Sequence, residues 1–218
     1  MRTISFCTQK GGSGKSTLAS SVAVAAHEAG ERVFILDMDP QQSLMKWAKV
    51  RKKNDVPVEA VQPGKLASIL NQLAKSGVTL CVIDTAGTES AATAAAMKAA
   101  DLCIIPARPN AFDLWASEIT RKALRELRKE YVFLLNQCPP SQQSARIEEG
   151  VAALEKMGGL ISPLIGARAD YQDAARNGCG VTEWSANGDA AIEMRKLWSS
   201  IRKRIGPAAK AAPVRKAA

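Results

Sequence analysis

The residues that decide the fold read Gln9-Lys10-Gly11-Gly12-Ser13-Gly14-Lys15-Ser16-Thr17, between an apolar run from Ile4 to Cys7 and a helical pattern from Leu18 to Ala29. A strand, a glycine-rich turn and a helix start favour an anion cradle, because the glycines let successive backbone N–H groups point inward and the helix N-terminus adds partial positive charge. Gly14-Lys15-Ser16 matches the end of the phosphate-loop motif, whose lysine reaches the β- and γ-phosphates and whose hydroxyl binds Mg²⁺. The stretch predicts a nucleotide-phosphate site, since a flexible turn with chance lysines would need several coincidences in the flanking sequence.

The loop departs from the usual phosphate-loop motif, which has a glycine five residues before its Gly-Lys pair, where this chain has Gln9. Lys10 instead gives the loop a second lysine. In this the loop resembles the deviant Walker A motif of the ParA/MinD family of ATPases. The resemblance implies that Gly11 to Thr17 bind ATP, with Lys15 on the phosphates. It also implies that Lys10 reaches across an ATP-bound homodimer to the nucleotide of the partner subunit.

A pair of carboxylates ends the second apolar run, in Leu36-Asp37-Met38-Asp39-Pro40-Gln41-Gln42-Ser43. Residues i and i+2 of a strand share a face, which is costly for like charges unless a cation or water network uses them. The segment is similar to switch I of the ParA family. That similarity implies that Asp39 orients or activates the attacking water and that Asp37 supports the Mg²⁺ shell. An Asp-Pro turn that caps a helix is the competing interpretation.

A third motif, Cys81-Val82-Ile83-Asp84-Thr85-Ala86-Gly87, is an apolar strand with one aspartate at its end. A glycine just beyond can bring its N–H close to a γ-phosphate, which is the Walker B and switch II arrangement. We therefore expect Asp84 to hold Mg²⁺ through water, together with Ser16.

Two later segments carry weaker signals. The stretch from Leu102 to Trp115 resembles the segment after the fifth strand in small plasmid-partition ATPases of the ParA type, where its role is structural and at the dimer interface. Asp113 is a minor candidate on that basis. Asn136 matches the asparagine of the family that hydrogen-bonds adenine, although a buried asparagine that caps a strand end explains it equally well.

Short apolar strands alternate with amphipathic helices along the chain, which indicates an α/β fold with a mainly parallel twisted sheet covered by helices on both faces. The resemblance implies a P-loop NTPase domain over residues 1–205, and the composition of residues 206–218 predicts a basic, disordered tail. The expected strands are Arg2 to Thr8, Arg32 to Asp37, Val56 to Val61, Thr79 to Asp84, Leu102 to Pro106, Tyr131 to Asn136 and Leu160 to Ile165. The expected helices are Lys15 to Ala29, Gln42 to Lys53, Gly64 to Ser76, Glu89 to Ala100, Phe112 to Lys129, Ser144 to Met157 and about Asn187 to Ile205. After Ile165 the pattern changes over Arg168 to Asn177 and is broken by Gly-Cys-Gly at 178–180.

Positive charge is concentrated at the C-terminal end. Residues 195–218 contain eight lysines and arginines and no acid, and so account for all but one of the net charge of +9. Such a segment favours contact with a polyanion such as nucleic acid or an anionic membrane, with a merely solubilising role as the alternative.

Cysteine usage and hydropathy bear on the compartment. The five cysteines are scattered without a C-x-x-C pair, and three lie in apolar runs, which is typical of reduced thiols in a cytosolic protein. No segment approaches the length of a membrane span, and residue 2 already begins a strand, so we expect neither a signal peptide nor an N-terminal helix-turn-helix domain. The expected location is the cytoplasm, associated with the nucleoid.

The resemblance implies a partitioning ATPase with ATP and Mg²⁺ as cofactors. Two copies would pair around ATP, bind DNA without sequence preference and hydrolyse ATP to segregate or position a plasmid, chromosome or protein cargo. A ParB-like or cargo-adaptor protein would stimulate hydrolysis. The basic C-terminal end supports the DNA step, because lysine and arginine contacts to phosphate release counterions.

Three alternatives stay open at this point. One is a MinD-like ATPase on a membrane, although the tail has only Val214 among its large aliphatic residues and lacks the amphipathic helix expected of it. Another is an iron–sulfur carrier of the same fold, for which Cys103 and Cys138 lack suitable neighbours. The last is a small-molecule kinase or ligase, which would need an acceptor pocket that the sequence does not reveal.

Overall fold

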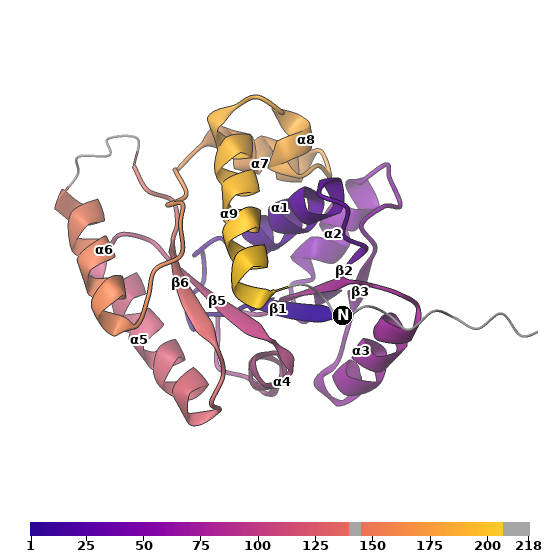
Figure 1. Cartoon of the computed structure of the whole chain (residues 1–218), viewed down its shortest axis with the longest axis horizontal. Coiled ribbons are helices and arrows are strands. Elements are labelled where there is room, and N and C mark those ends of the chain that lie inside the picture. Colours follow the sequence, from indigo (N-terminus) through magenta and orange to yellow (C-terminus); the bar gives the residue numbers. More distant parts are fainter. Residues whose placement is uncertain (140–144, 207–218) are drawn as a thin grey trace, which may run out of the picture.

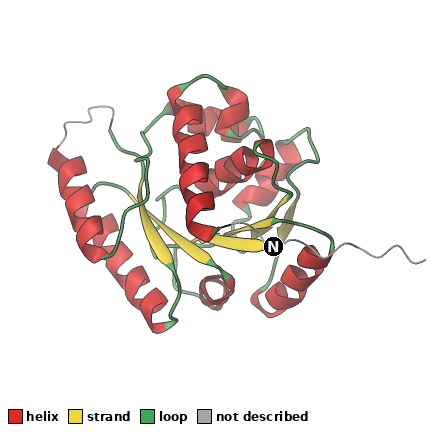
Figure 2. Cartoon of the chain, viewed as in Figure 1, coloured by secondary structure: helices red, strands yellow, loops and turns green. Residues whose placement is uncertain are grey.

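The computed structural model describes residues 1–139 and 145–206. Within them, six strands form one parallel sheet in the order β3-β2-β4-β1-β5-β6 (Figure 2). The strands are β1 (Arg2–Phe6), β2 (Val33–Asp37), β3 (Val58–Ala60), β4 (Leu80–Asp84), β5 (Leu102–Ala107) and β6 (Tyr131–Leu135). The expectation of a parallel α/β sheet is confirmed.

Helices cover both faces of the sheet (Figure 1). One face packs against α1 (Lys15–Glu28), α2 (Ser43–Val50), α7 (Ala169–Arg176), α8 (Val181–Trp184) and α9 (Asp189–Ile205). The other packs against α3 (Leu66–Lys75), α4 (Ala91–Ala99), α5 (Ala111–Glu126) and α6 (Ala145–Met157), and a 3-10 turn η1 (Pro63–Lys65) precedes α3.

Burial on both faces explains why the strands are apolar throughout. Ile4 and Phe6 of β1 lie in the cluster under α1 and α9, and the alternate residues of β5 lie in the cluster under α5 and α6. Cys81 and Cys103 are buried strand residues, which confirms that these thiols serve as small apolar side chains.

The register of the central strands builds one edge of the sheet. Phe6 of β1 lies beside Asp84 of β4, and Asp84 lies beside Asp37 of β2. The glycine-rich loop leaves β1 at that edge. Parallel strands end side by side, so the loop and the two acidic motifs, distant in sequence, meet at the carboxyl ends of the strands.

The seventh expected strand, Leu160 to Ile165, is wrong. This segment runs beside β6 and makes only isolated bridges, Phe133 with Leu160 and Cys138 with Gly166. Pro163 has no N–H to donate to a ladder, so regular pairing cannot continue through it.

Other differences concern the ends of elements. Helix α5 ends at Glu126 rather than Lys129, because Arg128 adopts a left-handed conformation (φ 53°). The short helix α8 was not expected. Helix α2 ends at Val50 because Arg51 leaves the helical conformation.

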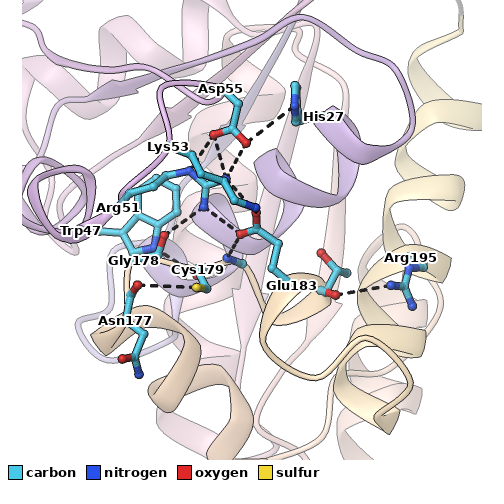
Figure 3. Close-up of polar contacts among 12 residues, drawn as sticks. His27, Trp47, Arg51, Lys53, Asp55, Asn177, Gly178, Cys179, Glu183 and Arg195 are labelled. Carbon is cyan, nitrogen blue, oxygen red and sulfur yellow. Dashed lines mark hydrogen bonds and ion pairs between the residues drawn. The ribbon is translucent and has the colours of Figure 1, made fainter.

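A buried ion cluster around Arg51 joins the end of α2 to α7 and α8 (Figure 3). The Arg51 side chain is 3% exposed, and its guanidinium lies 2.8 Å from carboxylate oxygens of both Asp55 and Glu183. It also donates to the carbonyl of Gly178 at 2.9 Å. Nearby, Trp47 Nε1 donates to the Cys179 carbonyl at 3.1 Å. These contacts fix the helix that follows Asp37 and Asp39 against the C-terminal layer.

Several expectations fall outside the described residues: the start of the sixth helix at Ser144, and the structure of the tail beyond Gly206, with Lys210, Arg215 and Lys216. Over residues 1–139 and 145–206, no helix has the length and apolar character that crossing a bilayer requires.

Candidate functional site

The glycine-rich loop connects β1 to α1, and its conformation depends on glycine. Gly12 and Gly14 have φ of 76° and 91°, which non-glycine residues rarely adopt. A Cβ on Gly14 would also overlap the side-chain amide of Asn136. Helix α1 starts at Lys15, so its N-terminal N–H groups face the loop. The expected anion cradle is therefore present as backbone geometry.

The Lys15 side chain lies within the loop. The residue is only 7% exposed, and Nζ donates to the Lys10 carbonyl at 3.1 Å. Burial lowers the pKa of Lys15, while the carboxylates of Asp84 and Asp39 act in the opposite direction. A phosphate in the cradle would place further negative charge near an ammonium group that is already desolvated, where charge interactions are strong.

Ser16 and Asp84 form the pair expected to hold the metal. Ser16 Oγ donates to Asp84 Oδ2 at 2.6 Å. Asp84 is fully buried, and its Oδ1 has no hydrogen-bond partner among the described residues. Burial raises the pKa of Asp84 to about 7, although the Ser16 hydrogen bond lowers it. A buried carboxylate oxygen with an unmet acceptor suits the water shell of a cation.

The described residues contain no group of three His, Cys, Asp or Glu side chains that could hold a metal alone. Mg²⁺ does not need such a cage, because it keeps several waters and uses one or two protein ligands together with substrate phosphates. Ser16 and Asp84, beside the loop, fit that pattern.

The two carboxylates after β2 have different environments. Asp37 is buried, and its oxygens accept from the backbone N–H groups of Asp39, Leu44 and Met45 at 3.0–3.1 Å. It therefore caps the start of α2, and its place in a Mg²⁺ shell stays a prediction. Asp39 is half-buried, and within the described part of the chain its carboxylate accepts only from Gln41 N–H, at 2.9 Å. Of the two, Asp39 is more accessible to water and substrate.

Gly87, in the segment after β4, approaches the loop very closely. A Cβ on Gly87 would lie 2.7 Å from the Gly11 nitrogen and 2.9 Å from the Lys10 carbonyl carbon. The hydroxyl of Thr85 donates to the Phe6 carbonyl at 3.0 Å and secures the same segment to β1. The expected switch II segment is thus packed directly against the loop.

Asn136 contacts the outside of the loop. Its Nδ2 donates to the Ser13 carbonyl at 2.7 Å, and Gln137 Nε2 donates to the Gly12 carbonyl at 3.1 Å. Asn136 also lines a cavity of about 420 Å³, bounded on the far side by residues between 166 and 172. The cavity adjoins the start of α1. The adenine contact of Asn136 stays a prediction.

The sequence reasoning missed the 166–172 segment. The sequence did contain a signal for it. Ligands lie beyond the carboxyl ends of parallel strands, and this segment follows the apolar run from Leu160 to Ile165 that was expected to be a strand. A larger hollow of about 700 Å³ lies on the other side of Arg168, toward α9, away from the phosphate cradle. Arg168 is already paired with Asp189 and Glu193, at 2.9 and 2.7 Å, so it offers no unpaired charge for a phosphate.

Asp113 lies in the first turn of α5, and the side chain of Lys10, a loop residue, reaches the same place. Lys10 Nζ is 5.9 Å from the centre of the Phe112 ring. Asp113 is 1% exposed and paired with Arg108 at 2.7 Å, which supports a structural role. The site thus brings together Lys15, Ser16, Asp37, Asp39 and Asp84, while Lys10 is directed elsewhere.

The basic end of α9 is remote from this site. Arg202 lines a small hollow with Arg2, Thr79 and Leu80, at the starts of β1 and β4. Figure 1 shows the same arrangement, with the end of α9 next to the N-terminus. The exposed Arg202, Lys203 and Arg204 therefore lie at the edge opposite the loop.

Comparisons with known proteins agree with this geometry. The AAA domain family model AAA_31 matches residues 1–153. "Maintenance of carboxysome distribution protein A" of Halothiobacillus neapolitanus is 28% identical over 209 residues, which cover 91% of this chain and 95% of that protein. "Protein ParA" of Rhizobium radiobacter is 31% identical over 115 residues, 52% of this chain and 51% of that protein.

Among solved structures, the septum site-determining protein MinD of Pyrococcus horikoshii, complexed with Mg-ADP, has the same fold. The TM-score is 0.76 at 20% identity, covering 96% of this chain and 99% of that one. ATP and Mg²⁺ are the cofactors of ATPases of this type, and the loop and the Ser16–Asp84 pair fit them. The chain therefore belongs to the AAA domain family that matches residues 1–153, and it is a ParA/MinD-type ATPase with the deviant Walker A motif.

Proposed function

We propose that this chain is a positioning ATPase of the ParA type. Two copies pair around ATP, the pair binds DNA without sequence preference, and hydrolysis separates the copies and releases the DNA. Residues 1–205 act as the ATPase domain and the basic C-terminal end serves the DNA step. The protein works in the cytoplasm, on the nucleoid.

The observation that carries the proposal is the different placement of the two loop lysines. Lys15 is buried inside the cradle, whereas the Lys10 ammonium lies on the side of α5. A single copy thus brings one lysine to the cradle. The Lys10 ammonium lies outside its own cradle, which supports a reaction in which it serves the nucleotide of a second copy.

In the proposed reaction the protein mainly binds and orients. Backbone N–H groups of the loop and the Lys15 ammonium hold the phosphates, which neutralises charge that would otherwise oppose attack. Ser16 and Asp84 would hold Mg²⁺, which supplies charge neutralisation on the phosphate oxygens. Asp39, with one oxygen engaged by Gln41 N–H, orients the attacking water. No covalent intermediate with the protein is needed.

The names of two relatives support a proposal about the cargo. The relative from Halothiobacillus neapolitanus is named for carboxysome distribution, and the relative from Rhizobium radiobacter is a ParA. We propose that the cargo is a protein assembly or a plasmid, recognised through an adaptor protein that stimulates hydrolysis. The greater coverage of the first match favours a protein assembly.

DNA retention tests the proposal. The Asp39→Ala variant should keep ATP binding, lose turnover and accumulate as a DNA-bound pair. Replacement of Arg202, Lys203 and Arg204 by glutamine should weaken DNA binding with little change in ATP affinity. The matched control replaces Lys122, Arg125 and Arg128, which are exposed on and just after α5.

The assay is a filter-binding titration with and without ATP over a range of salt. Each lost phosphate contact should reduce the slope of log affinity against log salt by about one. ATP-independent binding that does not respond to salt would contradict the proposal. Binding to anionic vesicles in place of DNA would move it to a MinD-like function.

A further inference from the structure

Phe112 is an exposed aromatic residue that contacts Lys10 of the glycine-rich loop. The residue is 68% exposed, so burial within this chain does not explain its position. Lys10 Nζ lies 5.9 Å from the centre of its ring, within the range of about 6 Å over which an aromatic ring attracts a cation. Trp115 meets the ring edge-on, with centroids 5.5 Å apart. Phe112 therefore presents a supported ring to the second lysine of the motif.

The contact lies between two segments that are held relative to each other. Asp113 accepts from Arg108 Nε at 2.7 Å and from Asn110 Nδ2 at 2.8 Å, which secures the first turn of α5. At the other side, Gln9 N–H donates to Thr120 Oγ1 at 3.2 Å and attaches the start of the loop to the same helix. The ring and the lysine are thus brought together by the backbone, not only by two long side chains.

The main chain of Lys10 is engaged on the cradle side. Its carbonyl accepts from Lys15 Nζ at 3.1 Å and from Ser13 Oγ at 3.4 Å. The side chain reaches α5 instead. Lys10 can serve another nucleotide only if its ammonium leaves the ring, while its carbonyl stays part of the loop.

We propose that Phe112 is a positioning residue for Lys10: its ring holds the ammonium on its own chain, and two copies must give up this contact when they pair. The inference rests on the proposed ATP-dependent pairing. An exposed contact of this kind changes an equilibrium by a factor of about 2.3 to 5.4. Because a pair contains two such contacts, the ring should weaken pairing by about 5- to 30-fold.

The first measurement is the NMR signal of the Lys10 side chain, assigned by its loss in Lys10→Arg. Protons over a ring face are shifted upfield by the ring current. Phe112→Leu should abolish the shift, Phe112→Tyr should keep it, and Ile119→Ala, on the same exposed helix, should leave it unchanged. A Lys10 signal that is the same in Phe112→Leu and the unmodified chain would overturn the proposal.

The second measurement is the ATP-dependent pairing constant from sedimentation, with Asp39→Ala included in every variant to prevent turnover. Phe112→Leu should tighten pairing by about 5- to 30-fold, and Phe112→Tyr should restore the original value. A merely structural role of Phe112 would weaken pairing or lower stability, and either result, or no change in pairing, would overturn the proposal.

The two measurements separate this inference from the proposed function. If no variant pairs with ATP, the proposed pairing is wrong, and so is the inference that Phe112 weakens it. The Lys10 signal would still show whether the ring holds the lysine within one chain.

Discussion

The hydroxyl of Ser16 donates to Asp84 Oδ2 at 2.6 Å, which joins the first turn of α1 to the end of β4 across 68 positions of sequence. Asp84 is fully buried, and its other oxygen has no partner among the described residues. This pair places one carboxylate and one hydroxyl beside the phosphate loop, where a phosphate-bound Mg²⁺ would lie.

The effect of Mg²⁺ should depend on pH. Burial raises the pKa of Asp84 to about 7, so the carboxylate is largely protonated at pH 6 and largely charged at pH 8. We expect Mg²⁺ to tighten ATP binding much more at pH 8 than at pH 6, and Asp84→Asn to remove the difference. Calorimetric titration of ATP with and without Mg²⁺ at both pH values is the test. An equal Mg²⁺ effect at both would contradict the assignment.

Asp84 should also make the stability of the metal-free protein fall as the pH rises, whereas the effect of Mg²⁺ on ATP binding grows. An acid whose pKa is raised by folding binds its proton more tightly in the folded state, so its stabilising contribution is lost as pH rises from about 4 through 7. Without Mg²⁺, Asp84→Asn should therefore be more stable than the unmodified chain at pH 8 and similar to it at pH 5. Urea unfolding at the two pH values measures this.

The buried Arg51 cluster should carry a large share of the stability of the α2 region. Removing one partner of a buried pair leaves the other charge uncompensated, so Arg51→Met should lower the free energy of unfolding by about 3 kcal/mol. Lys53→Met is the matched control, because Lys53 contacts the same Glu183 but is 61% exposed, so solvent screens its charge and the change in stability should be far smaller than for Arg51→Met.

The cluster also gives a prediction at low pH. Burial alone would raise the pKa of Glu183, but hydrogen bonds from Arg51 and Lys53 lower it to about 2. The stabilisation is present above the ordinary glutamate pKa and is lost as pH falls from about 4.5 toward 2. Arg51→Met should flatten this part of the stability curve, and an unchanged acid transition would argue against the ion pair.

Gly87 should be intolerant of a side chain because of its contact with the loop. A Cβ would lie 2.7 Å from the Gly11 nitrogen, so Gly87→Ala must displace the loop or the switch II segment. We expect ATP affinity to fall by about tenfold or more, the effect of a displacement worth at least about 1.4 kcal/mol. Gly64→Ala, which meets nothing within 4 Å, is the control and should bind ATP normally.

Asp37 and Asp39 should respond differently to alanine. Asp37 accepts three backbone N–H groups, so Asp37→Ala should lower the free energy of unfolding by about 1–3 kcal/mol and weaken the start of α2. Asp39→Ala should cost less than about 1 kcal/mol of stability and abolish turnover. Unfolding curves and phosphate release, measured together, separate the two roles. Normal turnover in Asp39→Ala would show that another group orients the water.

Much of the site could be predicted from sequence because its parts are local motifs at strand ends. The loop, Asp37 and Asp84 each follow a continuous apolar run, and parallel pairing brings such ends together. The competing interpretation of the acidic pair, a helix cap, applies to Asp37, which accepts from the N–H groups of Leu44 and Met45 at the start of α2. The 160–165 run has the composition of a strand, yet Pro163 interrupts its pairing with β6.

The remaining features depend on side chains from distant segments. The contact of Lys10 with Phe112 spans about a hundred residues, and no local pattern indicates it. Arg51 with Glu183 is a similar case, since each is an ordinary charged residue in its own segment. Such pairs depend on the exact position of α5 and α8 in the fold. The hydrophobic pattern predicts on which face of the sheet a helix packs, but not which of its side chains meets which residue of another segment.

The central claim is that the loop and Lys15 hold the triphosphate of ATP, and calorimetric titration of ATP with Mg²⁺ into the unmodified chain and Lys15→Ala tests it most directly. Lys49→Ala, an exposed lysine of α2, is the control. The account predicts saturable one-to-one binding to the unmodified chain and to Lys49→Ala, and none to a folded Lys15→Ala. Equal affinity of Lys15→Ala and the unmodified chain would contradict it.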